Sequence, residues 1–204
     1  MSESRRIALA MTGASGVQYG FRLLECLLEA DVRVELVVSK AAQMVAALET
    51  DWRLPSRPAE LADRLREHFG CPKEQLVVYG REDWTAPMAS GSNPPEAMVI
   101  CPCTTGTLAA VAGGLSDSLL ERAADVMLKE RRKLILVPRE APFSEIHLEH
   151  MLKLARMGAV VLPPNPGFYH RPQTVEDIID FVVARILDHL AVDQDLIRPW
   201  GGED

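Results

Sequence analysis

The chain has 204 residues, 48% of them hydrophobic and 25% charged, with a formal net charge of -7. This composition is typical of one globular domain with a sizeable core, and the acidic balance excludes a sequence-independent grip on nucleic acid. No apolar run approaches the ~20 residues that a membrane span needs, and the N-terminus lacks the apolar region of a signal peptide. We therefore expect a cytoplasmic protein that binds neither nucleic acid nor a membrane.

The first predicted elements are a strand and a helix joined by a glycine turn. The strand covers residues 7–11, the turn G-A-S-G covers 13–16, and an amphipathic helix follows over 17–30. Glycines let the backbone approach a ligand, and free N–H groups at a helix start attract an anion. We interpret the turn as a phosphate cradle, with an ordinary strand-to-helix turn as the alternative, because neither G-x-G-x-x-G nor the P-loop lysine is present.

The rest of the chain alternates between strand and helix patterns. Further strands are predicted over residues 32–38, 75–79, 97–101, 133–137 and 159–162. Further helices are predicted over residues 41–49, 59–69, 105–113, 119–132, 146–157 and 175–190. Long loops of the kind that carry function cover 80–95 and 163–172, and residues 192–204 form a polar tail containing Trp200.

This alternation predicts an α/β fold in which residues 1–204 form a single doubly wound domain. We expect a mostly parallel sheet of about six strands, in a Rossmann or flavodoxin-like three-layer sandwich. Ligands bind such sheets outside the carboxyl ends of the strands. The candidate motifs follow strands and should meet at that edge; they are residues 13–16, Ser39-Lys40, 104–107 and Arg139-Glu140.

The residue types at this edge suit a mononucleotide with a phosphate tail. Hydroxyl and N–H groups of residues 13–16, Ser39 and 104–107 can hold one phosphate, although helix capping is an alternative role for the threonines. The Arg139 guanidinium can donate two parallel hydrogen bonds to a phosphate. Glu140 would then lie in a positive field, as a proton-transfer group or as half of a structural ion pair.

Metal chemistry has little support in the sequence. The segment Cys101-Pro102-Cys103 has no second Cys or His pair at finger spacing, and His147 and His150 do not form an H-E-x-x-H motif. A disulfide framework is also improbable in a cytosolic protein. We expect no metal site.

Motifs along the whole chain resemble those of the UbiX family of flavin prenyltransferases. They are M-T-G-A-S-G-V-Q-Y-G, S-K-A-A-Q, W-T-A-P-M-A-S-G-S, C-P-C-T-T-G-T-L, E-R-A-A-D-V-M-L-K-E-R-R, V-P-R-E-A-P-F and P-G-F-Y-H-R-P. The resemblance implies an enzyme that joins a dimethylallyl group from dimethylallyl monophosphate to N5 and C6 of reduced FMN, without a metal. It also implies that a UbiD-type decarboxylase receives the prenylated FMN, for example in ubiquinone synthesis, and that the chain forms a homo-oligomer, commonly a dodecamer.

The resemblance also implies roles for individual residues. The FMN-binding set is Gly13, Ala14, Ser15, Ser39, Thr104, Thr105, Gly106, Thr107 and Arg139. The set around the prenyl phosphate is Arg122, Lys129, Glu140, Tyr169 and Arg185. The catalytic set is Ser15, Lys129, Glu140 and Tyr169. Aromatic faces of Trp84, Tyr169 and Trp200 could shield an allyl cation. Thr104 stands where the family often has Ser, and the hydroxyl remains.

Two other functions stay open. A flavin-dependent cysteine decarboxylase would need a peptide-clamping loop, where this chain has P-R-E and Y-H-R. A flavin carrier would have no use for Glu140 and Lys129 facing the ring. We also expect a homo-oligomer with sites at subunit contacts, because apolar positions exceed what one sheet layer buries; they include Met44, Val45, Met127 and Met151.

Overall fold

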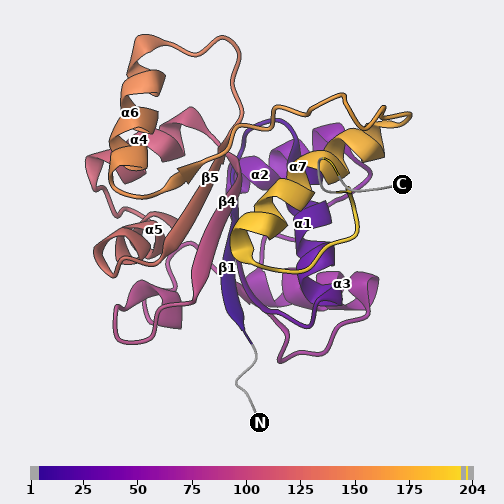
Figure 1. The fold of residues 1–204 in the computed structure, drawn as a ribbon. Coiled ribbons are helices and arrows are strands. Elements are labelled where there is room, and N and C mark those ends of the chain that lie inside the picture. Colours follow the sequence, from indigo (N-terminus) through magenta and orange to yellow (C-terminus); the bar gives the residue numbers. More distant parts are fainter. Residues whose placement is uncertain (1–4, 199–200, 202–204) are drawn as a thin grey trace.

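The computed structural model describes residues 5–198 and 201 (Figure 1). The strands are β1 (Arg6–Met11), β2 (Arg33–Val38), β3 (Leu76–Tyr79), β4 (Ala97–Cys103), β5 (Lys133–Pro138) and β6 (Val160–Val161). The α-helices are α1 (Val17–Glu29), α2 (Lys40–Glu49), α3 (Pro58–Phe69), α4 (Thr105–Gly113), α5 (Leu119–Lys129), α6 (Glu145–Arg156) and α7 (Val175–Leu190), and Pro87–Ala89 forms a 3-10 turn, η1. None of the helices in the described ranges is long and apolar enough to cross a membrane.

The predicted α/β fold is confirmed, and every strand pair of the described sheet is parallel. The six strands lie in the order β3-β2-β1-β4-β5-β6, which is the Rossmann order. The order reverses between β1 and β4, so the turns that follow these strands diverge. A crevice for a ligand is therefore expected outside the carboxyl ends of β1 and β4.

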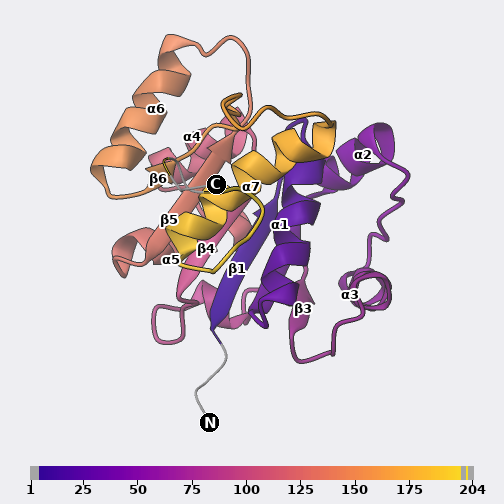
Figure 2. The same cartoon turned by 45° about the vertical axis from the view of Figure 1, so that its right-hand side comes forward.

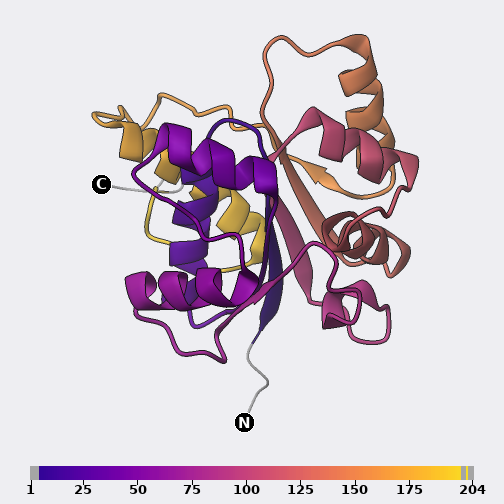
Figure 3. The ribbon, with the colours of Figure 1, turned by 180° about the vertical axis from the view of Figure 1, so that it is seen from behind.

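Helices cover both faces of the sheet, as a doubly wound fold requires (Figures 1 and 3). Helices α1, α2, α3 and α7 pack on one face, against Ile7, Leu9 and Met11 of β1. Helices α4, α5 and α6 pack on the other face, toward which Ala8 and Ala10 point. This period-2 alternation explains why both faces of β1 are apolar and buried.

Two predicted boundaries differ from the structure by more than one residue. Strand β4 continues to Cys103, two residues beyond the predicted end at Cys101. Helix α5 ends at Lys129 rather than at Arg132. The reason is that Arg131 adopts a left-handed backbone conformation with φ 55°, which turns the chain toward β5.

The predicted long loop over 80–95 replaces a crossover helix between β3 and β4. It is anchored by Met88 of η1, which is fully buried, and by a hydrogen bond from the Leu119 N–H to the Arg81 carbonyl. Trp84 stays about half exposed (48%) near the start of this loop. The loop thus covers the face of the sheet on which α5 packs.

Glu35 is a buried carboxyl in the middle of β2. Its side chain is 0% exposed and forms an ion pair with Arg6 (Nε–Oε1 3.3 Å), but neither oxygen accepts a hydrogen bond. Burial raises the pKa of Glu35, while the charges of Arg6 and Arg33 oppose this shift. Glu96 shows the opposite behaviour, because the hydrogen bond from Arg5 holds the pKa of this carboxyl below its usual range.

The two carboxyls should therefore affect stability in opposite directions with pH. A raised folded-state pKa makes a carboxyl less favourable as the pH rises above the usual range for Glu, so Glu35→Gln should gain stability relative to wild type as the pH rises above about 4. A lowered folded-state pKa stabilises above that range, so Glu96→Gln should lose stability at neutral pH, and the loss should shrink as the pH falls through the lowered pKa. Melting temperatures measured from acidic to neutral pH test both signs. If the melting temperatures of both variants changed in the same direction relative to wild type as the pH rises, the opposite pKa shifts of Glu35 and Glu96 would be contradicted.

Candidate functional site

The turn after β1 is built so that only glycine fits at its first position. A Cβ atom on Gly13 would lie 2.3 Å from the Ala41 Cβ atom of α2. Gly16 has φ 98°, in the left-handed region that side chains disfavour. The turn therefore lies directly against the start of α2, at the carboxyl edge of the sheet.

The start of α1 already holds an anion that belongs to the chain. The Oε2 atom of Glu49 accepts hydrogen bonds from the N–H groups of Gly16 (2.8 Å) and Val17 (3.3 Å). Contrary to the sequence-based expectation, these two N–H groups are not free for a phosphate. Sequence reasoning missed Glu49, because a glutamate at the end of a surface helix looks ordinary. The backbone of Gly13 to Ser15 remains the part of the predicted cradle that can face a ligand.

Thr12 joins the turns that follow β1 and β4. Its hydroxyl donates to the Pro102 carbonyl (2.7 Å) and accepts from the Thr104 N–H (2.8 Å), and the side chain is almost fully buried. The Thr12 N–H donates to the same Pro102 carbonyl (3.1 Å). Sequence reasoning also missed this residue, whose only signal is its place between a buried strand and a glycine turn.

Hydroxyls cap α2 and α4, which also begin at this edge. The Ser39 Oγ atom accepts from the Ala42 N–H (3.0 Å) at the start of α2. The Thr104 Oγ1 atom accepts from the Thr107 N–H (3.0 Å) and bonds the Thr107 hydroxyl (2.9 Å) at the start of α4. The capping interpretation is confirmed for Thr104. Both helix N-termini direct partial positive charge to the crevice, and the first turn of α4 contributes Thr105 and Gly106.

Arg139 connects the turn after β5 with the turn after β1. Its N–H donates to the Cys103 carbonyl (3.3 Å), and its Nε atom donates to the Ser15 carbonyl (3.2 Å). Glu140 follows, with its Oε1 atom accepting from the Ala141 N–H (3.0 Å). No ion pair of Glu140 occurs within residues 5–198, so the alternative role in a structural ion pair finds no support there.

Tyr169 lies in the loop after β6, which also starts from the carboxyl edge. Its ring packs edge-on against Phe181 of α7, with centroids 5.6 Å apart, and half of the residue is exposed. The neighbouring His170 ring stacks on Phe181 at 5.1 Å. Phe181 therefore fixes Tyr169 and His170 against α7. The predicted contribution of Trp200 lies outside the described residues.

Three predicted cations lie away from this edge within one chain. Lys129 ends α5 just before β5 begins, and it forms an ion pair with Glu130. Arg122 donates to the Ala89 carbonyl in η1 (3.1 Å). Arg185 pairs with Asp188 in the last turns of α7, a helix whose end lies beside the start of β1. A single chain thus does not bring Lys129, Arg122 and Arg185 together with Arg139 and Glu140.

The remaining chemistry of the edge suits anion binding. The hydrogen-bond donors at this edge match a phosphate monoester. They are the N-termini of α2 and α4, the hydroxyls of Ser39, Thr104 and Thr107, and the Arg139 guanidinium. Burial raises the pKa of the Cys103 thiol to about 12, so this group is not a ready nucleophile. Among the described residues, no three His, Cys, Asp or Glu side chains come together as metal ligands.

Comparison with known sequences finds close relatives over nearly the whole chain. Residues 1–187 match the family model described as Flavoprotein. The flavin prenyltransferase UbiX of Pseudomonas aeruginosa is 61% identical over 201 residues, which cover 98% of this chain and 96% of the relative. The flavin prenyltransferase UbiX of Methanothermobacter thermautotrophicus is 45% identical over 204 residues and covers 100% of both chains.

Solved structures show the same similarity. A crystal structure of AnUbiX (PadA1) in complex with FMN and dimethylallyl pyrophosphate matches with a TM-score of 0.87 and 41% identity, covering 99% of this chain and 100% of that one. A dodecameric FMN-dependent UbiX-like decarboxylase from Escherichia coli O157:H7 matches with a TM-score of 0.84 and 41% identity, covering 97% and 100%. A PPC decarboxylase mutant shares only the fold, at 21% identity, a TM-score of 0.57 and coverage of 84% and 86%.

Removing the Thr12 hydroxyl should loosen the crevice. Thr12→Val keeps the shape but leaves the part-buried Thr104 N–H without its acceptor, which costs at most about 1–3 kcal/mol. At this chain length the melting temperature should fall by about 2–4 °C per kcal/mol. Thr12→Ser keeps the hydroxyl and is the matched control. Equal stability of the valine and serine variants would show that the bridge contributes nothing.

Proposed function

This chain belongs to the UbiX family of flavin prenyltransferases, and from that premise we propose that it joins a dimethylallyl group to N5 and C6 of reduced FMN. The observation that carries the proposal is the carboxyl edge of the sheet, where the family's FMN motifs meet around Thr12 and Arg139. The enzyme is a transferase, and FMN is its prenyl acceptor. Bound there in reduced form, FMN supplies the nucleophilic N5 and C6 atoms.

The flavin phosphate is assigned to the N-termini of α2 and α4. The start of α1 is less suitable because Glu49 occupies its first N–H groups and would repel a second anion. Ser39, Thr104 and Thr107 supply hydroxyls beside the two other helix starts. Gly13 allows close approach of the backbone, and Arg139 supplies a full positive charge.

Prenyl transfer places specific demands on the other side chains. Breaking an allylic C–O bond leaves a phosphate and a delocalised allyl cation. Lys129, Arg122 and Arg185 are assigned to stabilise the leaving phosphate in place of a metal. Glu140, half-exposed at the edge, is assigned to take the proton released when the flavin C6 position is substituted. Tyr169 and Trp84 present aromatic faces to the cation.

We assign the completion of the site to neighbouring copies of the chain. The separation of Lys129 and Arg185 from Glu140 within one chain supports this, because transfer needs the phosphate and the proton acceptor in one place. A similar protein is dodecameric. Helix α6 stands outside α4 and β6 (Figure 2) and exposes Leu148 and Leu152 on one face and Ile146 on another, each more than half exposed.

The apolar positions predicted from the sequence to lie at contacts divide into two groups. Met44 on α2 is 67% exposed, as expected of a contact residue, whereas Val45 and Met151 are partly buried against the core of their own chain. Met127 is 0% exposed and belongs to the core of its own chain, so its inclusion was wrong. The reason is that α5 packs directly on β4 and β5.

Two finer assignments complete the proposal. Dimethylallyl monophosphate is the proposed donor, although a similar protein was crystallised with the pyrophosphate. The proposed recipient of prenylated FMN is a UbiD-type decarboxylase in the cytoplasm. The cysteine decarboxylase alternative has only fold similarity behind it, at 21% identity to a PPC decarboxylase.

The reaction is tested with reduced FMN and dimethylallyl monophosphate under anaerobic conditions with EDTA. We expect a flavin heavier by one five-carbon prenyl unit in mass spectra after denaturation. Lys129→Ala should slow its formation by about 10²–10³-fold and Glu140→Gln by about 10²–10⁴-fold, with FMN binding retained. Lys73→Ala, at an exposed position, is the control.

Absence of product with both the monophosphate and the diphosphate would overturn the transferase assignment. Dependence of product formation on added Mg²⁺ would overturn only the metal-free mechanism.

The shared site is tested by complementation between two inactive variants. When Lys129→Ala and Glu140→Gln chains are co-expressed in equal amounts, sites that join residues of two copies should recover about a quarter of wild-type activity by random assembly. Each variant assembled alone should stay inactive. Mixed oligomers that are verified by two affinity tags and still inactive would place Lys129 and Glu140 in the same chain's site.

A further inference from the structure

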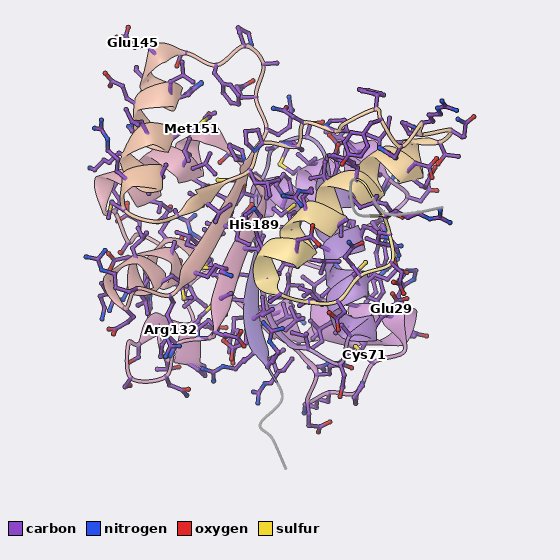
Figure 4. All side chains as sticks on the ribbon, viewed as in Figure 1. Glu29, Cys71, Arg132, Glu145, Met151 and His189 are labelled. Atoms are coloured by element: carbon purple, nitrogen blue, oxygen red, sulfur yellow. The ribbon has the colours of Figure 1, made fainter. Side chains whose placement is uncertain are left out.

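The amino edge of the sheet, opposite the candidate site, carries a cluster of arginines. They come from three places in the sequence: Arg5-Arg6, Arg33 and Arg132. Because parallel strands all begin at this edge, the residues that precede or open β1, β2 and β5 meet there. Figure 4 labels Arg132, which lies toward the end of the molecule where β1 begins, away from Glu145 at the other end. The four side chains line one cavity of about 490 Å³.

Two of these arginines are fully engaged within the chain. Arg5 holds Glu96 through Nη2 (2.6 Å) and Nε (3.0 Å). Arg6 donates through Nη2 to the Asn93 carbonyl (2.6 Å) and to the Asn93 Oδ1 atom (2.8 Å), and its Nε atom faces Glu35. Asn93 and Glu96 also line the cavity. These contacts make one wall of the cavity rigid.

The two other arginines form no hydrogen bond or ion pair with residues 5–198, although the charge of Arg33 acts on Glu35 and that of Arg132 on Glu96 and Glu130. The Arg33 Nε atom is buried and makes no hydrogen bond. The Arg132 side chain is exposed and takes part in none of the hydrogen bonds or ion pairs formed by residues 5–198. A buried donor without an acceptor is costly, and most buried polar atoms in proteins are satisfied. The Arg33 side chain also lines the cavity, so an acceptor that enters the cavity can meet its terminal nitrogens, for which none of residues 5–198 provides a hydrogen bond.

The charge balance identifies the kind of acceptor. Four guanidinium groups face the carboxylates of Glu96 and Glu35, so an excess of two positive charges remains at this edge. This excess stands out in a chain whose formal net charge is -7. A phosphate monoester carries about two negative charges near neutral pH, and its oxygens match the fork of a guanidinium.

We propose that this cavity is a second anion site, separate from the flavin crevice, which binds the phosphate group of a small phosphorylated molecule between Arg33 and Arg132. The volume of about 490 Å³ exceeds what one phosphate needs and leaves room for a small organic body. Its lining contains no aromatic ring, so a polar body fits better than a nucleotide base. Free phosphate and a phosphate monoester share this chemistry.

The site is tested by counting phosphate ions that the FMN-loaded protein binds at constant ionic strength. Wild type should bind one more inorganic phosphate per chain than Arg33→Gln/Arg132→Gln, or bind it about tenfold more tightly. Arg57→Gln/Arg156→Gln removes the same charge from exposed positions away from the cavity and is the matched control. Arg132→Gln alone keeps the test valid if the double variant does not fold, because this side chain is exposed.

Crystals soaked in tungstate then locate the site. Anomalous density between Arg33 and Arg132 supports the proposal, as does displacement of bound phosphate by glycerol 2-phosphate in wild type but not in the Arg33→Gln/Arg132→Gln variant. Weaker displacement by glycerol 2-phosphate than by inorganic phosphate identifies the free ion as the ligand. Density in soaked crystals without any difference in solution binding means an adventitious ion only and overturns the proposal. Equal loss of binding in the two double variants overturns it as well, because net charge would then explain the effect.

Discussion

The carboxyl edge of the sheet depends on one buried hydroxyl at the point where the strand order reverses. Turns that leave β1 and β4 in opposite directions expose backbone groups that no neighbouring strand can pair. The Thr12 hydroxyl meets this constraint by donating to Pro102 and accepting from Thr104. Arg139 links the turn after β5 to the turn after β1, because its Nε atom donates to the Ser15 carbonyl. Three turns from distant parts of the sequence thus keep fixed relative positions, which a ligand with several polar atoms requires.

The elements of the fold were predictable because their signals are local. Each strand is a short apolar run, and each helix has apolar spacing and a start or stop residue such as Ser39 or Gly114. The carboxyl edge followed from the alternation of strands and helices, so the position of the motifs around Ser39, Thr104 and Arg139 could be derived before any coordinates. The end of α5 was missed because the left-handed backbone of Arg131 has no sequence signal.

The contacts between turns were not predictable, because they join residues that share no local pattern. Glu49 reaches Gly16 only because α2 packs beside the first turn, and Ala41 fixes that approach. The motif around Lys129 indicated a role at the prenyl phosphate, yet the direction of α5 carries this residue to the opposite edge of the same chain. A motif therefore identifies chemistry, whereas helix direction decides which copy of the chain can deliver it.

The two edges of the sheet use different sources of positive charge. At the carboxyl edge, helix N-termini supply partial charges, and a single guanidinium, Arg139, supplements them. At the amino edge, helices end and present carbonyl groups, which need donors. Arg5 and Lys133 meet that need by donating to the Leu190 and His189 carbonyls at the end of α7. Arg33 and Arg132 cap no helix. The fold uses their charges in part, because Arg33 acts on the buried carboxyl of Glu35 and Arg132 acts on Glu96 and Glu130. Neither guanidinium forms a hydrogen bond within residues 5–198 that would compete with an anion in the cavity.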